Sequence, residues 1–334
     1  MSRAVFGLGP LERWLADPDV TEVLVNAGAE VWIERRGAIG RAVDAAAAPS
    51  YVGPQYAGRL DAGVLDAVLE RILAPIGRRL DRSSPVVDAR LPDGSRVCAV
   101  VPPVAVDGAC LAIRRFGVES VPLASFASSS VTQLLAEIIG ARCNVLVSGA
   151  TSAGKTTLLN CLAALVGEHE RVITLEDTAE LRLPAAHVLR LETRPASPDG
   201  APMVDLGTLL RTALRLRPDR LVIGEIRGAE AGDLVQALNT GHDGSLATIH
   251  ANSPIDALAR LESLVVQASP GWTLDAVRDQ VRRSIDAVIH VRRDVTGQRE
   301  IAQVCEVDHA GAGLAVRALA ERSNVVASLT RRRR

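Results

Sequence analysis

The chain has 334 residues, a length that at about 150 residues per domain predicts two domains. Hydrophobic residues make up 48% of it and charged residues 23%, which excludes disorder for most of the chain. Its formal net charge of −1 and its few aromatic residues (three Phe, three Trp and two Tyr) give no strong nucleic-acid signal, because they provide neither a basic field nor many rings for stacking bases.

The first 118 residues carry the pattern of a mixed α/β domain. Apolar residues between Val64 and Ile76 share one helical face, with Asp61 as a candidate N-cap. The sequence PDGS at 92–95 is a hairpin signal, and residues 42–58, rich in Ala, Pro and Gly, indicate a connection. The predicted elements are helices at 11–17 and 64–76 and strands at 22–26, 30–34, 86–91, 96–101 and 111–116.

A segment rich in Ser, Pro and Ala at 117–130 separates this region from the rest. We therefore predict an N-terminal α/β domain over 1–118, a linker over 119–130 and a second domain over 131–334. In the second domain strand and helix patterns alternate, which predicts a largely parallel sheet. The predicted strands are 144–148, 171–175, 220–226, 245–250 and 287–293, and the predicted helices are 155–166, 204–216, 258–265 and 274–285.

The sequence also predicts a cytoplasmic protein. The longest apolar run, 97–106, is about half of what a bilayer crossing needs, and residues 1–10 lack the apolar core of a secretory signal. The five cysteines are widely spaced with no CxxC motif, so we expect reduced thiols rather than disulfides or a zinc site.

The strongest motif is GATSAGKT at 149–156, which matches GxxxxGK[ST] between a predicted strand and a predicted helix. Of the 38 basic residues only Lys155 is a lysine, which marks a position where a compact ammonium is needed. Its amine is expected at the β and γ phosphates of a nucleotide, and the hydroxyl of Thr156 at Mg²⁺. The predicted nucleotide-binding residues are Gly149, Ala150, Thr151, Ser152, Ala153, Gly154, Lys155, Thr156 and Thr157.

ATP is favoured over GTP as the nucleotide. A guanine-reading NKxD motif cannot occur, since the only lysine lies in the P-loop, and an LSGGQ motif is also missing, which disfavours an ABC transporter subunit. The predicted cofactors are therefore ATP and Mg²⁺.

Two acidic clusters follow predicted strands. LVIGE ends in Glu225, as a Walker B element does, and TLEDTAE places Glu176 and Asp177 after an earlier strand. Because the carboxyl ends of parallel strands meet at one edge of a sheet, we expect these groups beside the P-loop. We predict Thr156, Glu225 and Asp177 as the magnesium site.

Histidines and arginines supply further candidates. His242 and His250 flank one predicted strand, and we weigh a γ-phosphate sensor against an ordinary structural role. Most of the 37 arginines must be solvated, but clusters such as 114–115, 190–194 and 215–220 could supply charge to the phosphates of a neighbouring subunit. The four arginines at 331–334 predict a disordered basic tail with a weak signal for anionic lipid.

With these residues assembled, the chain resembles the type II and type IV secretion ATPases, and most closely their tight-adherence pilus (Tad/CpaF-type) branch. The similarity runs from about Leu8 to Arg293, and the order of its motifs is specific to that family. The matching motifs include VSGATSAGKTTLLN, ITLEDTAEL, LVIGEIRGAEAGDL and NTGHDGSLATIHANSPIDALARLE.

The resemblance implies a smaller PAS-like N-terminal domain followed by a RecA-like P-loop ATPase domain. It further implies a homohexamer with ATP between the two domains, and inner-membrane secretion or pilus platform proteins as partners that hold the ATPase at the membrane periphery. The catalytic residues it implies are Glu225, Glu176, Lys155, His250 and Arg114 or Arg115, with Asp177 in the Asp box and His242 beside the nucleotide in the His box.

One position departs from the family pattern. Family P-loops usually read Thr-Gly-Ser before the second glycine, where this chain has Thr151, Ser152 and Ala153. If position 152 needs a positive φ, serine introduces strain that glycine would not.

The main prediction is an ATP-hydrolysing motor that drives pilus assembly or protein export. One alternative is a nucleic-acid translocase of the conjugation or helicase type, which near-zero charge and scarce aromatics disfavour. A second is a nucleotide-gated scaffold with little turnover, which the altered P-loop makes plausible.

Overall fold

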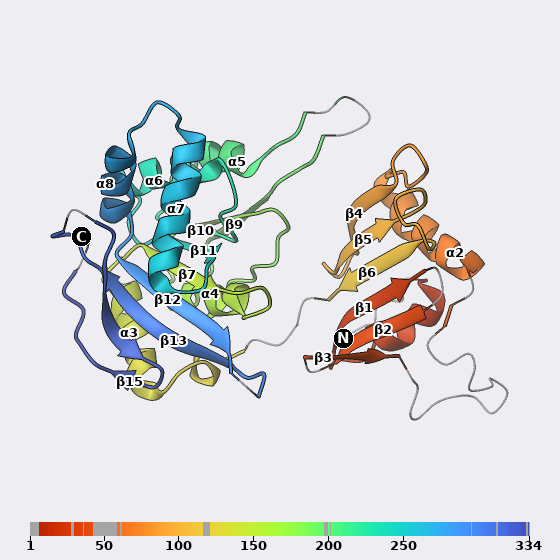
Figure 1. Cartoon of the computed structure of the whole chain (residues 1–334), viewed down its shortest axis with the longest axis horizontal. Coiled ribbons are helices and arrows are strands. Elements are labelled where there is room, and N and C mark those ends of the chain that lie inside the picture. The colour runs from red at the N-terminus through yellow and green to blue at the C-terminus, as the bar shows by residue number, and fades with distance from the viewer. Residues whose placement is uncertain are drawn as a thin grey trace. The chain divides into compact units, whose positions relative to one another are not determined.

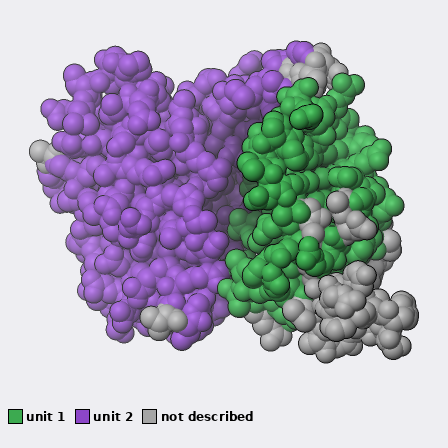
Figure 2. Space-filling model, turned by 45° about the vertical axis from the view of Figure 1, so that its right-hand side comes forward, with its two compact units in different colours: residues 1–120 green, residues 121–334 purple. Residues whose placement is uncertain are grey.

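The computed structural model divides the chain into two compact units, residues 1–120 and 121–334, which are coloured separately in Figure 2. It describes residues 7–27, 30–35, 37–42, 59–60, 62–115, 121–196, 200, 202–294, 296–311, 313–331 and 333. The predicted N-cap Asp61 and nearly all of the predicted connection 42–58 lie outside these ranges. None of the helices within them combines the length and apolarity needed to span a bilayer.

The first unit is built on a six-stranded antiparallel sheet of order β3-β2-β1-β6-β5-β4. Alternate residues of β1, such as Val23 and Val25, are fully buried and pack with the apolar face of α2, which presents Leu65 and Val68. The elements are η1 Gly9–Leu11, α1 Glu12–Leu15, β1 Val20–Asn26, β2 Glu30–Arg35, β3 Ala38–Arg41, α2 Ala62–Leu73, η3 Ala74–Ile76, β4 Val86–Arg90, β5 Arg96–Val100 and β6 Cys110–Arg114. Among the described strands of this unit, β3 was not predicted, because its four residues show no apolar alternation.

The second unit is a nine-stranded sheet of order β15-β14-β13-β12-β7-β11-β10-β8-β9, seen in Figure 1 with helices on both of its faces. Its elements are α3 Ser129–Gly140, β7 Val145–Gly149, α4 Lys155–Ala163, β8 Val172–Glu176, β9 Val188–Glu192, α5 Leu206–Leu214, β10 Arg220–Ile223, α6 Glu230–Asn239, β11 Leu246–His250, α7 Pro254–Ala268, α8 Leu274–Ser284, β12 Ala287–Arg293, β13 Arg299–Val307, β14 Val316–Glu321 and β15 Asn324–Val325.

The alternation of side chains along β7 shows how the two faces are filled. Val145 and Val147 belong to the core formed with α3 and α4, whereas Leu146 belongs to the core formed with α5 to α8. Every residue of β7, β8 and β10 is buried, as expected for central strands covered on both faces. The central strands are parallel, as predicted, and place their carboxyl ends at one edge of the sheet.

Several elements of this unit were not predicted. β12 pairs with β13 in antiparallel fashion and starts a hairpin extension through β14 and β15. The segment assigned to the linker begins this unit, because Phe126 is buried in the core and its carbonyl accepts a hydrogen bond from Ile301 N at 3.0 Å. Helices α3 and α6 and strand β9 were also missed.

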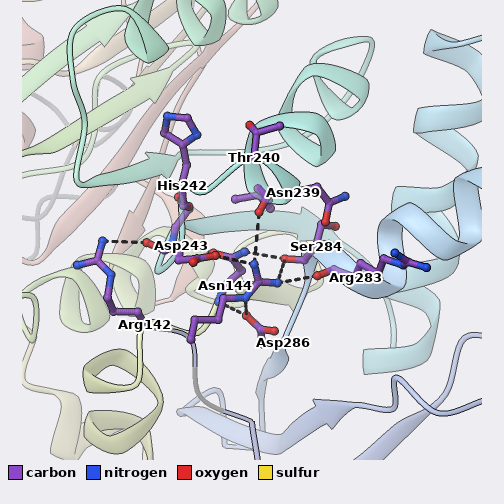
Figure 3. A network of polar contacts seen from close by, with 12 residues as sticks. Arg142, Asn144, Asn239, Thr240, His242, Asp243, Arg283, Ser284 and Asp286 are labelled. Atoms are coloured by element: carbon purple, nitrogen blue, oxygen red, sulfur yellow. Dashed lines mark hydrogen bonds and ion pairs between the residues drawn. The ribbon is translucent and has the colours of Figure 1, made fainter.

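A buried polar network closes the edge of the sheet opposite the carboxyl ends (Figure 3). Asp286 is fully buried, and its Oδ2 accepts hydrogen bonds from Asn144 N at 2.7 Å and Arg333 Nε at 2.6 Å. Arg331 pairs with the other carboxylate oxygen. Arg333 also lies 2.6 Å from Asp243 and donates to the carbonyls of Arg283 and Ser284.

The prediction of a disordered basic tail was therefore wrong for the two tail residues that the structure describes, Arg331 and Arg333. Their partner Asp286 is distant in sequence, so the basic run alone gave no sign of it. Burial raises the pKa of Asp286 in spite of both arginines, which indicates that the carboxylate depends on them to remain charged.

Replacing Arg331 and Arg333 with alanine in the variant R331A/R333A should leave the buried Asp286 carboxylate without its charged partners. We expect the free energy of unfolding, measured by urea denaturation at pH 7.5 with circular dichroism, to fall by about 3 kcal/mol. The control Arg283→Ala removes an exposed pair with Asp279 and should change it by less than about 1 kcal/mol. Equal small effects in both variants would contradict a stabilising role for the network.

Candidate active site

The P-loop connects the end of β7 to the start of α4. Gly149 is required at its first position, because a Cβ there would lie 2.3 Å from the carbonyl oxygen of Val291. Gly154 adopts φ +101° and is the N-cap residue of α4. Ser152, between them, also has a positive φ of 59°. The loop thus curls over the amino end of α4, whose first amides have no acceptor within the helix and suit an anion.

Lys155 extends back across the mouth of this loop and is 8% exposed. Its Nζ donates to the carbonyl oxygens of Gly149 at 3.1 Å and Ala150 at 3.0 Å, and lies 3.1 Å from Nδ1 of His250. These neutral acceptors hold the ammonium where phosphate oxygens of a nucleotide would replace them.

The acidic groups predicted beside the P-loop are joined to Lys155 through His250. Nε2 of His250 lies 2.6 Å from Glu225 Oε1, and Glu225 Oε2 lies 2.6 Å from Arg227 Nη2. Nη1 of Arg227 lies 3.3 Å from Asp177 Oδ2. We call these five residues, Lys155, His250, Glu225, Arg227 and Asp177, the charge chain.

The protonation of His250 follows from its surroundings. Burial lowers the pKa of its imidazole, Lys155 and Arg227 add to the effect, and Glu225 opposes it. A neutral ring that accepts from Lys155 at Nδ1 carries its proton on Nε2, the atom that faces Glu225. His250 therefore connects the ammonium of Lys155 to the carboxylate of Glu225.

Glu176, at the end of β8, is a carboxyl group of a different kind. It is 2% exposed, and its Oε1 accepts hydrogen bonds from Glu180 N at 2.8 Å and Leu181 N at 2.9 Å. Oε2 is buried and has no hydrogen-bond partner among the described residues. Burial raises the pKa of Glu176 to about 7. The side chain packs against Gly224, where a Cβ would lie 3.0 Å from its Cγ, so it is held next to the backbone that carries Glu225.

The donor groups fit a magnesium nucleotide. Thr156 and Thr157 lie in the first turn of α4, Lys155 would supply the cation, and Glu225 and Asp177, now paired with Arg227, would supply oxygen ligands or acceptors for metal-bound water. Among the described residues Oε2 of Glu176 has no hydrogen-bond partner, so it is a further oxygen available at the same edge of the sheet.

One predicted site residue of the second unit, His242, is not brought to this position, and Arg114 and Arg115 belong to the first unit. His242 precedes β11 and His250 ends it, so the two lie at opposite edges of the sheet, and His242 lies beside the polar network drawn in Figure 3. Its Nδ1 lies 3.1 Å from the carbonyl oxygen of Ala237. In the first unit, Arg115 donates to the carbonyls of Asp17 and Val20, which ties it to its own domain. Arg114 lies 3.5 Å from Glu22 and its side chain is 50% exposed.

Some functional candidates were missed from the sequence, and one suggested arginine is structural. Arg227 could have been found, because it follows Glu225 by two residues. Arg293 and Arg299 reach the P-loop from the β12–β13 hairpin, and no local pattern marks them. Arg220, suggested as a donor to a neighbouring subunit, is instead buried and paired with Glu170.

The amino-acid sequence matches the family described as "Type II/IV secretion system protein" over residues 5–324. The chain belongs to this family. A putative conjugal transfer protein of Mycobacterium tuberculosis is 37% identical over 309 residues, which cover 89% of this chain and 84% of the relative. The type IV secretion system protein PtlH of Bordetella pertussis is 32% identical over 321 residues, covering 86% and 90%.

A solved structure shares the fold. The crystal structure of the pilus retraction motor PilT with bound ADP aligns with a TM-score of 0.63 at 19% identity, covering 88% of this chain and 81% of PilT. The shared architecture is a RecA-like ATPase domain preceded by an N-terminal domain. Family membership and the P-loop site together identify the chain as a secretion-type ATPase.

Glu176 should make the stability of this secretion ATPase depend on pH. A carboxyl whose pKa rises from 4.5 to about 7 on folding stabilises the fold fully below pH 4.5, and this contribution is lost as the pH rises through about 7. Between pH 5 and 8.5 the free energy of unfolding should therefore fall by about 3 kcal/mol relative to Glu176→Gln, whose amide does not titrate.

The measurement is urea unfolding of both proteins across this pH range. Glu192→Gln, at the paired position on the neighbouring strand β9, serves as the control and should follow the wild-type curve. Parallel curves for wild type and Glu176→Gln would show that Glu176 has no raised pKa.

Proposed function

We propose that this chain is a motor of a type II/IV secretion or Tad-type pilus assembly system, which couples hydrolysis of Mg·ATP to protein export or pilus assembly. The observation that carries the proposal is the charge chain, which runs without a break from the P-loop lysine to the carboxylates at the ends of β8 and β10.

Each residue then has a role in binding or turnover. The nucleotide supplies the phosphoanhydride bond, and its magnesium ion neutralises the charge of the phosphates. Lys155 exchanges the carbonyls of Gly149 and Ala150 for phosphate oxygens. Thr156 offers its hydroxyl to the metal, and Glu225 orients and polarises the attacking water.

His250 and Glu176 adjust this machinery. As Lys155 moves toward phosphate, His250 loses one of its two partners, and the hydrogen-bonding state of Glu225 changes with it. Glu176, with a pKa of about 7, exchanges a proton near neutral pH beside the same backbone. Asp177 and Arg227 form an exposed ion pair at the end of the charge chain.

Binding and turnover should separate in two variants. Lys155→Ala removes the cation that meets the phosphates, so binding of mant-ATP, followed by its fluorescence, should be lost together with hydrolysis. Glu225→Gln keeps the shape of the side chain but cannot polarise water, so it should bind with about wild-type affinity while kcat falls at least about 100-fold. Wild-type turnover in both variants would rule out this site.

The same assay separates the motor from its alternatives. Single-stranded DNA should leave the hydrolysis rate unchanged, whereas a nucleic-acid translocase would be stimulated. A scaffold that only binds nucleotide would show saturable mant-ATP binding with hydrolysis near the level of Glu225→Gln.

We further propose that the motor works as a homohexamer at the inner membrane, where platform proteins hold it, and that Arg114 contributes positive charge to the nucleotide. Family membership supports the ring, and the side-chain contacts favour Arg114 over Arg115. Arg115 is occupied by two carbonyls of its own domain, whereas half of Arg114 is exposed.

Alanine variants of these two arginines form a matched pair. Arg114→Ala should lower kcat by about 1000-fold with unchanged melting temperature, as expected for an arginine that stabilises transition-state charge. Arg115→Ala should instead lower the melting temperature, because two backbone carbonyls lose their donor. Mass photometry with Mg·ATP should find six copies in the wild type, and a fully active monomer would contradict the ring.

A further inference from the structure

The P-loop holds a serine in a backbone conformation that serine disfavours. Ser152 has a φ of 59°, in the left-handed region where the Cβ of an L-residue crowds the backbone. The residue is exposed, so packing of its own side chain does not keep it there. Inside the loop, Ala153 is buried and its amide donates to the carbonyl of Ala150 at 3.3 Å, so a contact to the Ser152 carbonyl from outside the loop would add to what holds this conformation.

Arg293, the last residue of β12, provides that contact. Its Nε donates to the carbonyl oxygen of Ser152 at 2.9 Å, and its Nη1 lies 3.3 Å from the carbonyl oxygen of Gly297 in the hairpin turn. The turn itself is braced by Asp294, whose Oδ1 accepts hydrogen bonds from the backbone amides of Thr296 and Gln298. The guanidinium thus joins the P-loop to the β12–β13 hairpin.

A second arginine of the same hairpin lies against the other end of the loop. Arg299 pairs with Arg293 across the hairpin, and its Nη1 lies 3.3 Å from Thr157 Oγ1. Its Cδ would lie 2.8 Å from a Cβ at Gly154, so no larger residue fits there without displacing it. The hairpin therefore contacts the loop on both sides of its left-handed segment.

We propose that Arg293 is a positioning residue for nucleotide binding, which holds Ser152 in the left-handed conformation that turns the P-loop amides inward. The proposal rests on the nucleotide site described above and assigns to Arg293 no contact with the nucleotide. Without Arg293, φ of Ser152 relaxes toward negative values, and the backbone amides of the P-loop no longer all point inward. With glycine at position 152 the left-handed conformation is unstrained, and Arg293 becomes dispensable.

The test is a double-mutant cycle of Arg293→Ala and Ser152→Gly. In the absence of nucleotide, hydrogen exchange of the peptide covering 149–157 should speed up about fivefold or more in Arg293→Ala, and Mg·mant-ADP should bind about tenfold more weakly. Starting from Ser152→Gly, the same arginine change should alter both quantities by less than about twofold. Arg293→Lys should restore part of the protection, because it retains one donor.

Arg292→Ala is the matched control, since Arg292 is adjacent on β12 and pairs with Glu300 at 2.7 Å. It should leave exchange and binding unchanged. Equal effects of Arg293→Ala in the serine and glycine backgrounds, or no effect in either, would overturn the proposal. A wild-type protein that binds no Mg·mant-ADP would instead overturn the proposed function, while the exchange measurement would still decide the role of Arg293.

Discussion

The register of the parallel strands is the constraint on which the rest of the site depends. β11 pairs with β7 so that His250 lies opposite Gly149, the first residue of the P-loop. β10 pairs with β8 so that Ile223 lies opposite Leu175, which brings the following Glu225 and Glu176 to the same edge. Because side chains alternate along a strand, a shift by one residue would turn them to the opposite face. The charge chain is thus a consequence of strand pairing.

The polar network at the far edge is well placed to hold this register. The Asn144 side chain donates to Ser284 O at 2.7 Å and accepts from Ser245 N at 3.1 Å, while its backbone amide donates to Asp286. These contacts tie together the starting points of β7, β11 and β12. Since β7 and β11 are only five residues long, fixing their starts also fixes where their ends, Gly149 and His250, lie beside each other. Buried polar groups satisfied in only one arrangement favour that arrangement over slipped pairings.

Short sequence motifs predicted the P-loop and the strands that lead to Glu176 and Glu225. These elements could be predicted because each is specified by a few consecutive residues. Arg293 lies in a hairpin formed by the pairing of β12 with β13. The polar residues of β13 do not follow a strand pattern, so the hairpin was not predicted. The position of His242 could have been deduced, because histidines before and after one strand cannot share an edge of the sheet. The tail arginines were misjudged, because their buried partner lies far away in the sequence.

Lysine and arginine make different kinds of contact in this chain. Lys155 lies inside the P-loop, where a compact ammonium on a flexible stem can exchange carbonyl acceptors for phosphate. Arg293 and Arg333 instead join backbone carbonyls or carboxylates that belong to different segments, a task that suits a planar group with several fixed donors. The chain therefore has its single lysine within the GxxxxGK[ST] motif, and uses guanidinium groups where segments distant in the sequence are held together around it.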